Sequence, residues 1–300
     1  MANFLLLAIV GLIAQLVDGS LGMAYGVTSQ SLLLAVGIAP ALASASVHIA
    51  EVGTTAASGA SHWRFGNVDW SKVWPLAIPG AIGAFFGAVV LSAFITAEAA
   101  EPIVAVFLFC LGIFVLARFS FRRHQRPVQV RPVSRAFLAP LGLIAGFLDA
   151  AGGGGWGPIS TPTLLSSGRM EPRKIIGTVD TSEFLVALSA SIGFLLALSF
   201  AEIPWTVVGA LLLGGVIAAP IAAYIVRILP ARILGSTVGG LILVTNMKTF
   251  LEAVGVGGAL AILIYILIVA VWIAAVAFSI QVNRQEKKGV TGDPSSSRVV

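Results

Sequence analysis

The sequence predicts an all-α integral membrane protein with two inverted-topology repeats, each a Gly-broken re-entrant hairpin plus three spans, and one extra C-terminal helix. Three observations lead to this prediction: an apolar composition, a series of membrane-length apolar segments and an internal duplication. Of the 300 residues, 58% are hydrophobic and 10% are charged, whereas soluble domains carry about 25% charged residues. A soluble chain this apolar would expose patches that drive association. Most of the surface is therefore expected to face lipid.

The apolar segments have lengths that suit a bilayer, in which a spanning helix needs roughly 20 residues. Segments of about this length occupy residues 42–61, 73–95, 101–118, 174–200, 205–228, 232–250 and 257–281. Two pairs of shorter segments flank Gly-rich breaks, namely 3–17 with 21–39 and 136–150 with 153–167. Glycine weakens helices and adopts backbone conformations that other residues avoid. Each pair is therefore predicted to form a hairpin that enters the membrane and returns.

The duplication relates the two hairpins and the helices that follow them. Residues 11–18, GLIAQLVD, align with residues 142–149, GLIAGFLD, so Asp18 is equivalent to Asp149. Further aligned pairs are Tyr25 with Trp156, Pro40 with Pro172, Val47 with Val179, Glu51 with Glu183 and Trp70 with Trp205. Each copy contains one hairpin and three crossings, which is an odd number, so the copies are predicted to have opposite orientations. Inverted repeats with broken helices are frequent among secondary transporters.

The predicted organisation has five parts. They are membrane repeat 1 over 1–118, a basic cytoplasmic linker over 119–135, membrane repeat 2 over 136–251, the extra transmembrane helix over 252–281 and a disordered cytoplasmic tail over 282–300. This arrangement places every basic residue except Lys248 on one side, which the positive-inside rule makes cytoplasmic. Glu98 and Glu202 are then external, and the C-terminus is cytoplasmic. If each hairpin is instead counted as two full spans, each copy still has an odd number of crossings, so the loops fall on the same sides. A bacterial inner membrane is the expected location.

Four ionisable residues lie inside the helices that follow the hairpins: His48 and Glu51 in repeat 1, Asp180 and Glu183 in repeat 2. Each pair has i,i+3 spacing, which places both side chains on one helix face. Ionisable groups within spans are costly and mark solute or proton pathways. All four are candidates for proton coupling, and His48 is the strongest because imidazole titrates near neutral pH. The alternative is that they hold the repeats together or cap helix ends near the membrane interfaces.

The Gly-rich breaks are the candidate solute site, because free helix N-termini bind anions and no Lys or Arg falls in the middle of a span. Candidate solute-binding residues are Gly22, Tyr25, Ser46, His48, Gly153, Gly155, Trp156 and Thr178. For the two aromatic residues, wedging the hairpin against neighbouring helices is the alternative role. Asp18 and Asp149 are interpreted as turn caps rather than solute contacts.

Other classes of function find little support. No Gly-x-Ser-x-Gly or His-Glu-x-x-His motif occurs, so an enzyme is not expected. The single Cys110 offers neither a disulfide nor a metal-ligand spacing, and no metal or cofactor is expected. The basic residues lie in short loops, which indicates membrane orientation rather than nucleic-acid binding. The expected partners are a small anionic solute and the lipid bilayer, and a homo-oligomer is compatible with the sequence.

Four features occur together in this chain: the Gly-rich hairpins, the prolines that follow them, the Arg64–Trp70 motif RFGNVDW and the spacing of Gly80, Gly83 and Gly87. With these features the chain resembles the sulfite exporter TauE/SafE family of membrane permeases over residues 4–280. The resemblance implies ATP-independent transport of a small anion such as sulfite, a sulfonate, thiosulfate or a related organic anion, and leaves the solute and direction open. A passive anion channel is the alternative, which proton-dependent accumulation would exclude.

The first hairpin departs from the Gly-rich pattern of the second. It has Leu21, Met23 and Ala24 where the second hairpin has Gly152, Gly154 and Gly155. The two halves of the site are therefore expected to be unequal.

Overall fold

The computed structural model describes residues 4–121, 133–167, 169–225 and 231–291, and within these ranges the chain is helical with no strand. The elements are α1 (Phe4–Leu21), α2 (Tyr25–Ala35), α3 (Pro40–Arg64), α4 (Trp70–Val89), the π-helical turn η1 (Val90–Phe94), α5 (Ala97–Phe121), α6 (Arg135–Gly152), α7 (Trp156–Ser167), α8 (Pro172–Ala197), α9 (Trp205–Ile225), α10 (Ala231–Ala253) and α11 (Gly258–Thr291). The predicted all-α class is confirmed.

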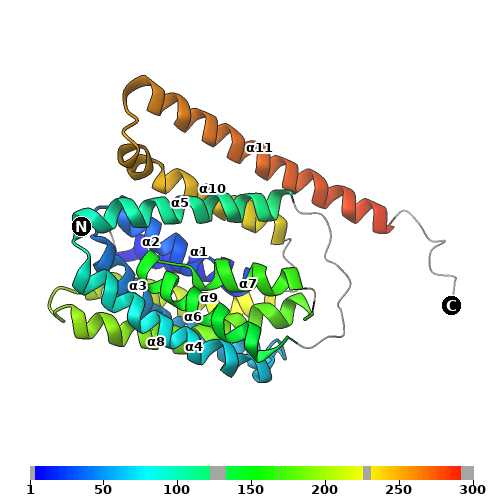
Figure 1. The fold of residues 1–300 in the computed structure, drawn as a ribbon. Helices are drawn as coiled ribbons and strands as arrows, with labels where there is room; N and C mark the ends of the chain where they lie inside the picture. Colours follow the sequence, from blue (N-terminus) through cyan, green and yellow to red (C-terminus); the bar gives the residue numbers. More distant parts are fainter. Residues whose placement is uncertain (1–3, 122–132, 168, 226–230, 292–300) are drawn as a thin grey trace.

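The helices run roughly parallel to one another in one bundle (Figure 1). Seven helices in the described part of the chain are long and apolar enough to cross a membrane: α1, α4 with η1, α5, α6, α8, α9 and α11. These spans confirm a multi-pass integral membrane protein. Helix α3 has 25 residues but is more polar, and its polar side chains are largely buried against other helices rather than exposed to lipid.

Each predicted hairpin contains two helices separated by three residues, 22–24 in the first and 153–155 in the second. The backbone has positive φ at Gly22 (67°), Ala24 (100°), Gly153 (77°) and Gly154 (132°). Glycine accepts such values at little cost. The second arms, α2 and α7, have 11 and 12 residues. At 1.5 Å per residue each extends roughly 17–18 Å, which is too short to cross a hydrocarbon core of about 30 Å.

Equivalent helices of the two repeats exchange partners. Helix α1 packs on α9 and its counterpart α6 packs on α4, while α3 pairs with α8 and α5 with α10. Individual residues show the same exchange of packing partners between the repeats. Gly11 lies against the backbone of Leu211, and its counterpart Gly142 lies against the backbone of Leu76. Leu76 and Leu211 occupy aligned positions, so each hairpin packs against the other repeat.

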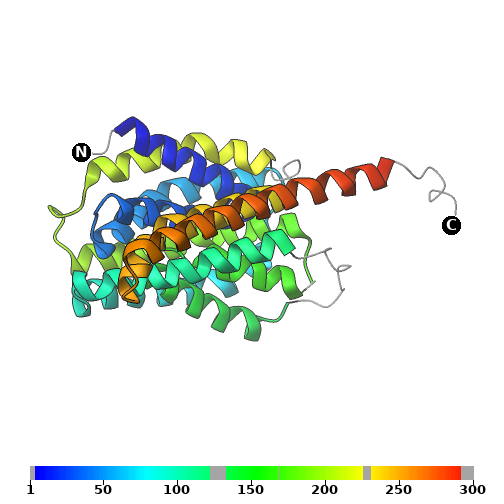
Figure 2. The same ribbon diagram turned by 90° about the horizontal axis from the view of Figure 1, so that it is seen from above.

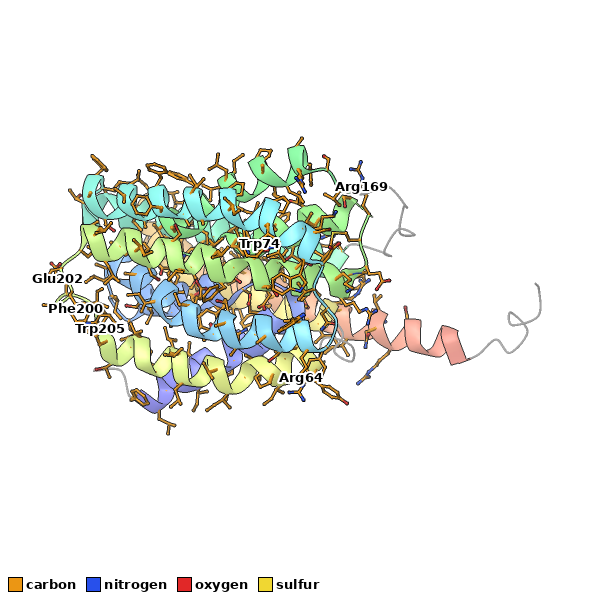
Figure 3. The ribbon with its side chains drawn as sticks, turned by 90° about the horizontal axis from the view of Figure 1, so that it is seen from below. Arg64, Trp74, Arg169, Phe200, Glu202 and Trp205 are labelled. Atoms are coloured by element: carbon orange, nitrogen blue, oxygen red, sulfur yellow. The ribbon has the colours of Figure 1, made fainter. Side chains whose placement is uncertain are left out.

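The two ends of the bundle carry different side chains. Figure 3 shows Arg64 and Arg169 at one end and Phe200, Glu202 and Trp205 at the opposite end. Trp205 donates a hydrogen bond from Nε1 to the Phe200 carbonyl at 3.0 Å, and the two rings lie 4.4 Å apart. Aromatic side chains of this kind gather at the membrane–water interface.

Helix α11 lies along one side of the bundle and extends beyond it (Figures 1 and 2). Only 6% of the most apolar 18-residue stretch of α11 is buried. The helix packs mainly on α10, where the Trp272 ring covers Gly240. The helix continues to Thr291, so it includes residues 282–291, which the sequence predicts to be part of the disordered tail. Residues 292–300 and most of the predicted linker, 122–132, lie outside the described ranges.

Candidate functional site

The breaks of the two hairpins meet in the interior of the bundle. A Cβ placed on Gly26 would lie 3.1 Å from the Cα of Gly154, and one placed on Gly154 would overlap the backbone nitrogen of Val27. The Thr161 hydroxyl of the second hairpin also donates to the carbonyl of Gly22 in the first. The backbones therefore approach more closely than side chains would allow, and the N-terminal ends of α2 and α7 come together.

An aspartate caps the second arm of each hairpin. Asp149 Oδ1 accepts hydrogen bonds from the backbone N–H groups of Gly155 (2.7 Å) and Trp156 (3.0 Å). Its counterpart Asp18 accepts from the N–H of Tyr25 through Oδ1 at 3.3 Å. These bonds satisfy donors that the first turn of a helix leaves free. The interpretation of both aspartates as caps is confirmed.

Asp149 also joins His48 and Glu51, and these three residues are named here the His48 cluster. His48 Nε2 lies 3.1 Å from Asp149 Oδ2 and 4.0 Å from Glu51 Oε2. All three side chains are buried, and neither Glu51 oxygen has a hydrogen-bond partner. Glu51 Oε1 would lie 3.3 Å from a Cβ on Gly26, so this carboxyl group is adjacent to the junction of the hairpins.

The hydrogen bonds of His48 show where its protons lie. Nδ1 is 2.8 Å from the carbonyl oxygen of Ser44, which can only accept, so Nδ1 carries a hydrogen. Nε2 faces a carboxylate oxygen of Asp149, so a second hydrogen lies between these two atoms. The pair therefore holds one proton more than a neutral imidazole beside an ionised carboxylate.

A second cluster contains Asp18, Asp180 and Glu183 and is named here the Asp180 cluster. One oxygen from each of the three buried carboxyl groups lies within 4.8 Å of the other two. The duplication aligns Asp18 with Asp149, Asp180 with His48 and Glu183 with Glu51. Each cluster thus combines two side chains from the long helix of one repeat with an aspartate from the hairpin of the other.

His62 approaches the Asp180 cluster, with Nε2 4.0 Å from Asp180 Oδ2. Its Nε2–H donates to the Gly19 carbonyl at 3.0 Å, and its Nδ1 accepts from the Asn67 amide at 3.2 Å. One nitrogen donates and the other accepts, which is the pattern of a neutral imidazole. His62 therefore supplies no positive charge to the three carboxyl groups.

The structure brings most of the predicted site residues together but assigns several of them to packing. His48, Glu51, Asp180 and Glu183 enter the two clusters, and the predicted glycines form the hairpin breaks beside them. The remaining polar atoms bind backbone: the Tyr25 hydroxyl donates to Leu211, Trp156 Nε1 to Val179 and the Ser46 hydroxyl to Leu42, while the Thr178 hydroxyl accepts from the N–H of Asp69.

The two aromatic residues also fill equivalent places. The Trp156 ring packs over Gly80 of α4, and the Tyr25 ring lies 3.4 Å from a Cβ position on Gly215 of α9. Gly80 and Gly215 are aligned in the duplication. This geometry favours the wedge role for both aromatic residues.

Sequence reasoning missed the second role of Asp18 and Asp149, which belong to the clusters as well as to the caps. A signal was available, because both are ionisable residues inside apolar segments at aligned positions. Among the residues that the structure describes, the buried carboxyl and imidazole groups are those of Asp18, Glu51, Asp149, Asp180, Glu183, His48 and His62, and no lysine or arginine is buried. The centre of the bundle is therefore rich in carboxyl groups.

Comparison with known proteins gives three matches. The family model described as "Sulfite exporter TauE/SafE" matches residues 7–249. "Probable membrane transporter protein YtnM" of Bacillus subtilis (strain 168) is 52% identical over 280 residues, which are 93% of this chain and 93% of that relative. "Probable membrane transporter protein YdhB" of the same organism is 26% identical over 242 residues, which are 79% of this chain and 95% of the relative. No solved structure matches the chain.

Proposed function

Because this chain belongs to the sulfite exporter TauE/SafE family, we propose that it is a proton-coupled secondary transporter of a small anion such as sulfite, a sulfonate or a related organic anion. The family and the relatives establish a membrane transporter. The finer proposal rests on one observation above the others: two equivalent clusters of ionisable side chains, one of them holding an extra proton, adjoin the junction of two broken helices.

The proposed solute position is the junction itself, bordered by Gly22, Gly153 and Gly155. The N-terminal ends of α2 and α7 meet there, and helix N-termini carry positive partial charge, although Asp18 and Asp149 already accept hydrogen bonds from some of their N–H groups. Glycine allows the solute to approach the backbone closely. Irregular backbone within a membrane persists where it is buried in protein or lines a solute pathway.

The carboxyl groups support coupling to protons. An ionised carboxylate repels an anion, and burial in a low-dielectric interior strengthens that repulsion. A proton on the His48–Asp149 pair, or on Glu51, removes negative charge next to the junction. Anion and proton then each raise the affinity of the protein for the other by the same factor.

The same charges argue against a passive anion channel. A continuous pathway past five buried carboxyl groups would favour cations. Every predicted solute-binding residue is buried in this conformation. Solute release therefore requires a rearrangement, as in alternating access between two repeats.

Three features support the proposed re-entrant, inverted-repeat architecture. The second hairpin arms are too short to cross the bilayer, equivalent helices exchange partners between the repeats, and the two clusters are equivalent under the same exchange. The end of the bundle that carries Arg64 and Arg169 is proposed to face the cytoplasm of a bacterial cell (Figure 3).

Transport by the purified protein in proteoliposomes tests the proposal. Sulfite, thiosulfate, sulfoacetate and a carboxylate would be supplied in turn, with and without an imposed pH gradient. We expect one of these anions to accumulate above its equilibrium level when the gradient is present, and a protonophore to abolish the accumulation. Flux that only equalises concentrations, whatever the gradient, would instead indicate a channel.

A further inference from the structure

The two equivalent clusters differ at one ionisable residue. In the His48 cluster, an imidazole with a proton on each nitrogen stands between two carboxyl groups. In the Asp180 cluster, the aligned position is itself an aspartate, so three carboxyl groups meet with no basic partner. His62, the adjacent imidazole, is neutral by its hydrogen bonds. Unpaired buried charges are strongly destabilising, so a positive charge from outside the chain would stabilise this cluster.

Two polar side chains other than the carboxyl groups lie beside the cluster. The Ser58 hydroxyl is fully buried and adjacent to the carboxyl group of Asp180, but it makes no hydrogen bond of normal geometry. The side-chain amide of Gln15 is also buried with both polar atoms unpartnered. Ser58 Oγ and Gln15 Nε2 each lie 3.5 Å from the position of a Cβ on Gly19, the residue after Asp18.

Three carboxyl oxygens in the cluster also have no hydrogen-bond partner. Asp18 caps α2 through Oδ1 only, and its Oδ2 has no hydrogen-bond partner, like both carboxyl oxygens of Asp180. Buried polar atoms normally have partners, and each exception calls for an explanation such as a bound ion. Several oxygen atoms thus point to one place from α1, α3 and α8.

We propose that Asp18, Asp180 and Glu183, together with the Ser58 hydroxyl, form a binding site for a hard metal cation. The cation supplies the positive charge that His48 provides in the equivalent cluster. Carboxylate and hydroxyl oxygens are the ligands of such ions, and Ca²⁺ binds them at 2.3–2.6 Å. Two ligands on opposite sides of an ion of this size are about 4.6–5.2 Å apart, which accommodates oxygens within 4.8 Å of one another. The combined negative charge of three carboxylates favours a divalent ion. Sodium, which is monovalent, uses the same oxygen ligands.

Ion binding can be measured without any transport substrate, so this proposal does not depend on the proposed anion transport. The melting temperature of the purified, chelator-treated protein in detergent would be followed in CaCl₂, MgCl₂ and NaCl, with choline chloride at matched ionic strength. We expect a saturable increase with one of these cations, because a ligand that binds only the folded state stabilises it. No increase with any of them, or stabilisation only by lowering the pH, would overturn the metal site in favour of protonated carboxyl groups.

Variants locate the site. Asp180→Asn is expected to abolish the cation-dependent increase, and Ser58→Ala to lower the apparent affinity several-fold. Glu171→Gln alters an exposed carboxylate paired with Arg173 and should keep the full response. A response that persists in Asp180→Asn would contradict the assignment. If Asp180→Asn does not fold, Mn²⁺ binding to the wild-type chain, followed by electron paramagnetic resonance, decides the question: one bound ion that Ser58→Ala weakens supports the site, and no bound ion overturns it.

Discussion

His48 and Asp180 occupy aligned positions, and this single difference gives the two clusters different chemistry. Each residue lies on the same face of its helix as a glutamate and contacts an aspartate from the other repeat. Where the residue is histidine, the cluster holds its own positive charge through the contact with Asp149 at 3.1 Å. Where it is aspartate, the proposed cation supplies the positive charge. The duplication thus places two different sets of side chains at equivalent positions.

The role of His48 is tested by His48→Gln. Glutamine can still donate a hydrogen bond to Asp149 but cannot take up a proton. If one proton accompanies the anion, the affinity for the anion changes by up to about tenfold per pH unit and falls as the pH rises. We expect this pH dependence to disappear in proteoliposomes that contain the variant.

Asp69→Asn is the matched control for His48→Gln, because it neutralises a half-buried N-cap of α4 outside the two clusters, and asparagine is an equally good cap. It should keep the wild-type pH profile. If His48→Gln leaves the pH dependence of transport unchanged, His48 has only a packing role.

Asp149 combines a cap with a proton-sharing contact, and two substitutions separate these roles. Asparagine keeps an oxygen for the N–H groups of Gly155 and Trp156 but removes the charge beside His48. We expect Asp149→Asn to fold and to lose proton coupling. Asp149→Ala loses the cap as well, which costs about 0.5–2 kcal/mol in helix stability and should lower the melting temperature. Equal melting temperatures for the two variants would contradict the capping role.

At the level of elements, the hairpin breaks depend on backbone that side chains cannot replace. Gly154 has φ of 132°, a value almost confined to glycine, and its Cα lies against the first turn of α2. Gly153 also has positive φ and lies against the side chain of Gln30. The N-terminal ends of α2 and α7 can meet only because these positions lack a Cβ.

Gly154→Ala should therefore destabilise the protein by about 1–3 kcal/mol and abolish transport. The melting temperature in detergent and uptake into proteoliposomes measure the two effects. Gly257→Ala is a matched control, since nothing lies within 4 Å of a Cβ at that position. A change at such an open site is expected to stay within about 0.5 kcal/mol. Normal uptake by Gly154→Ala would exclude a close approach of the hairpins as a requirement for transport.

At the level of the whole molecule, the charge asymmetry between the two ends of the bundle sets the proposed orientation. Arg64 and Arg169 lie at one end and Glu202 at the other (Figure 3). Lys174 is close to the basic end, where its Nζ donates to the carbonyl of Val68 at 3.2 Å. The positive-inside rule assigns this end to the cytoplasm.

Cysteine labelling in intact cells tests this orientation after Cys110, which is exposed, has been replaced by serine. A membrane-impermeant maleimide should label Glu202→Cys from outside. Arg169→Cys should react only after the cells are permeabilised. Labelling in the opposite pattern would invert the proposed topology and exchange the two faces of the transporter.

Composition, segment length and the duplication were sufficient to predict an all-helical membrane protein, because burial in lipid requires apolar spans whose backbone hydrogen bonds are satisfied within the helix. The caps at Asp18 and Asp149 could also be predicted, since they depend on residues close in sequence. Only the tertiary structure decided which side chains form a cluster. His48 meets Asp149, and Asp18 meets Asp180, through helices that exchange partners between the repeats. The periodic pattern of apolar and polar residues defines the faces of each helix. It does not say which face of another helix, far away in the sequence, will pack against it.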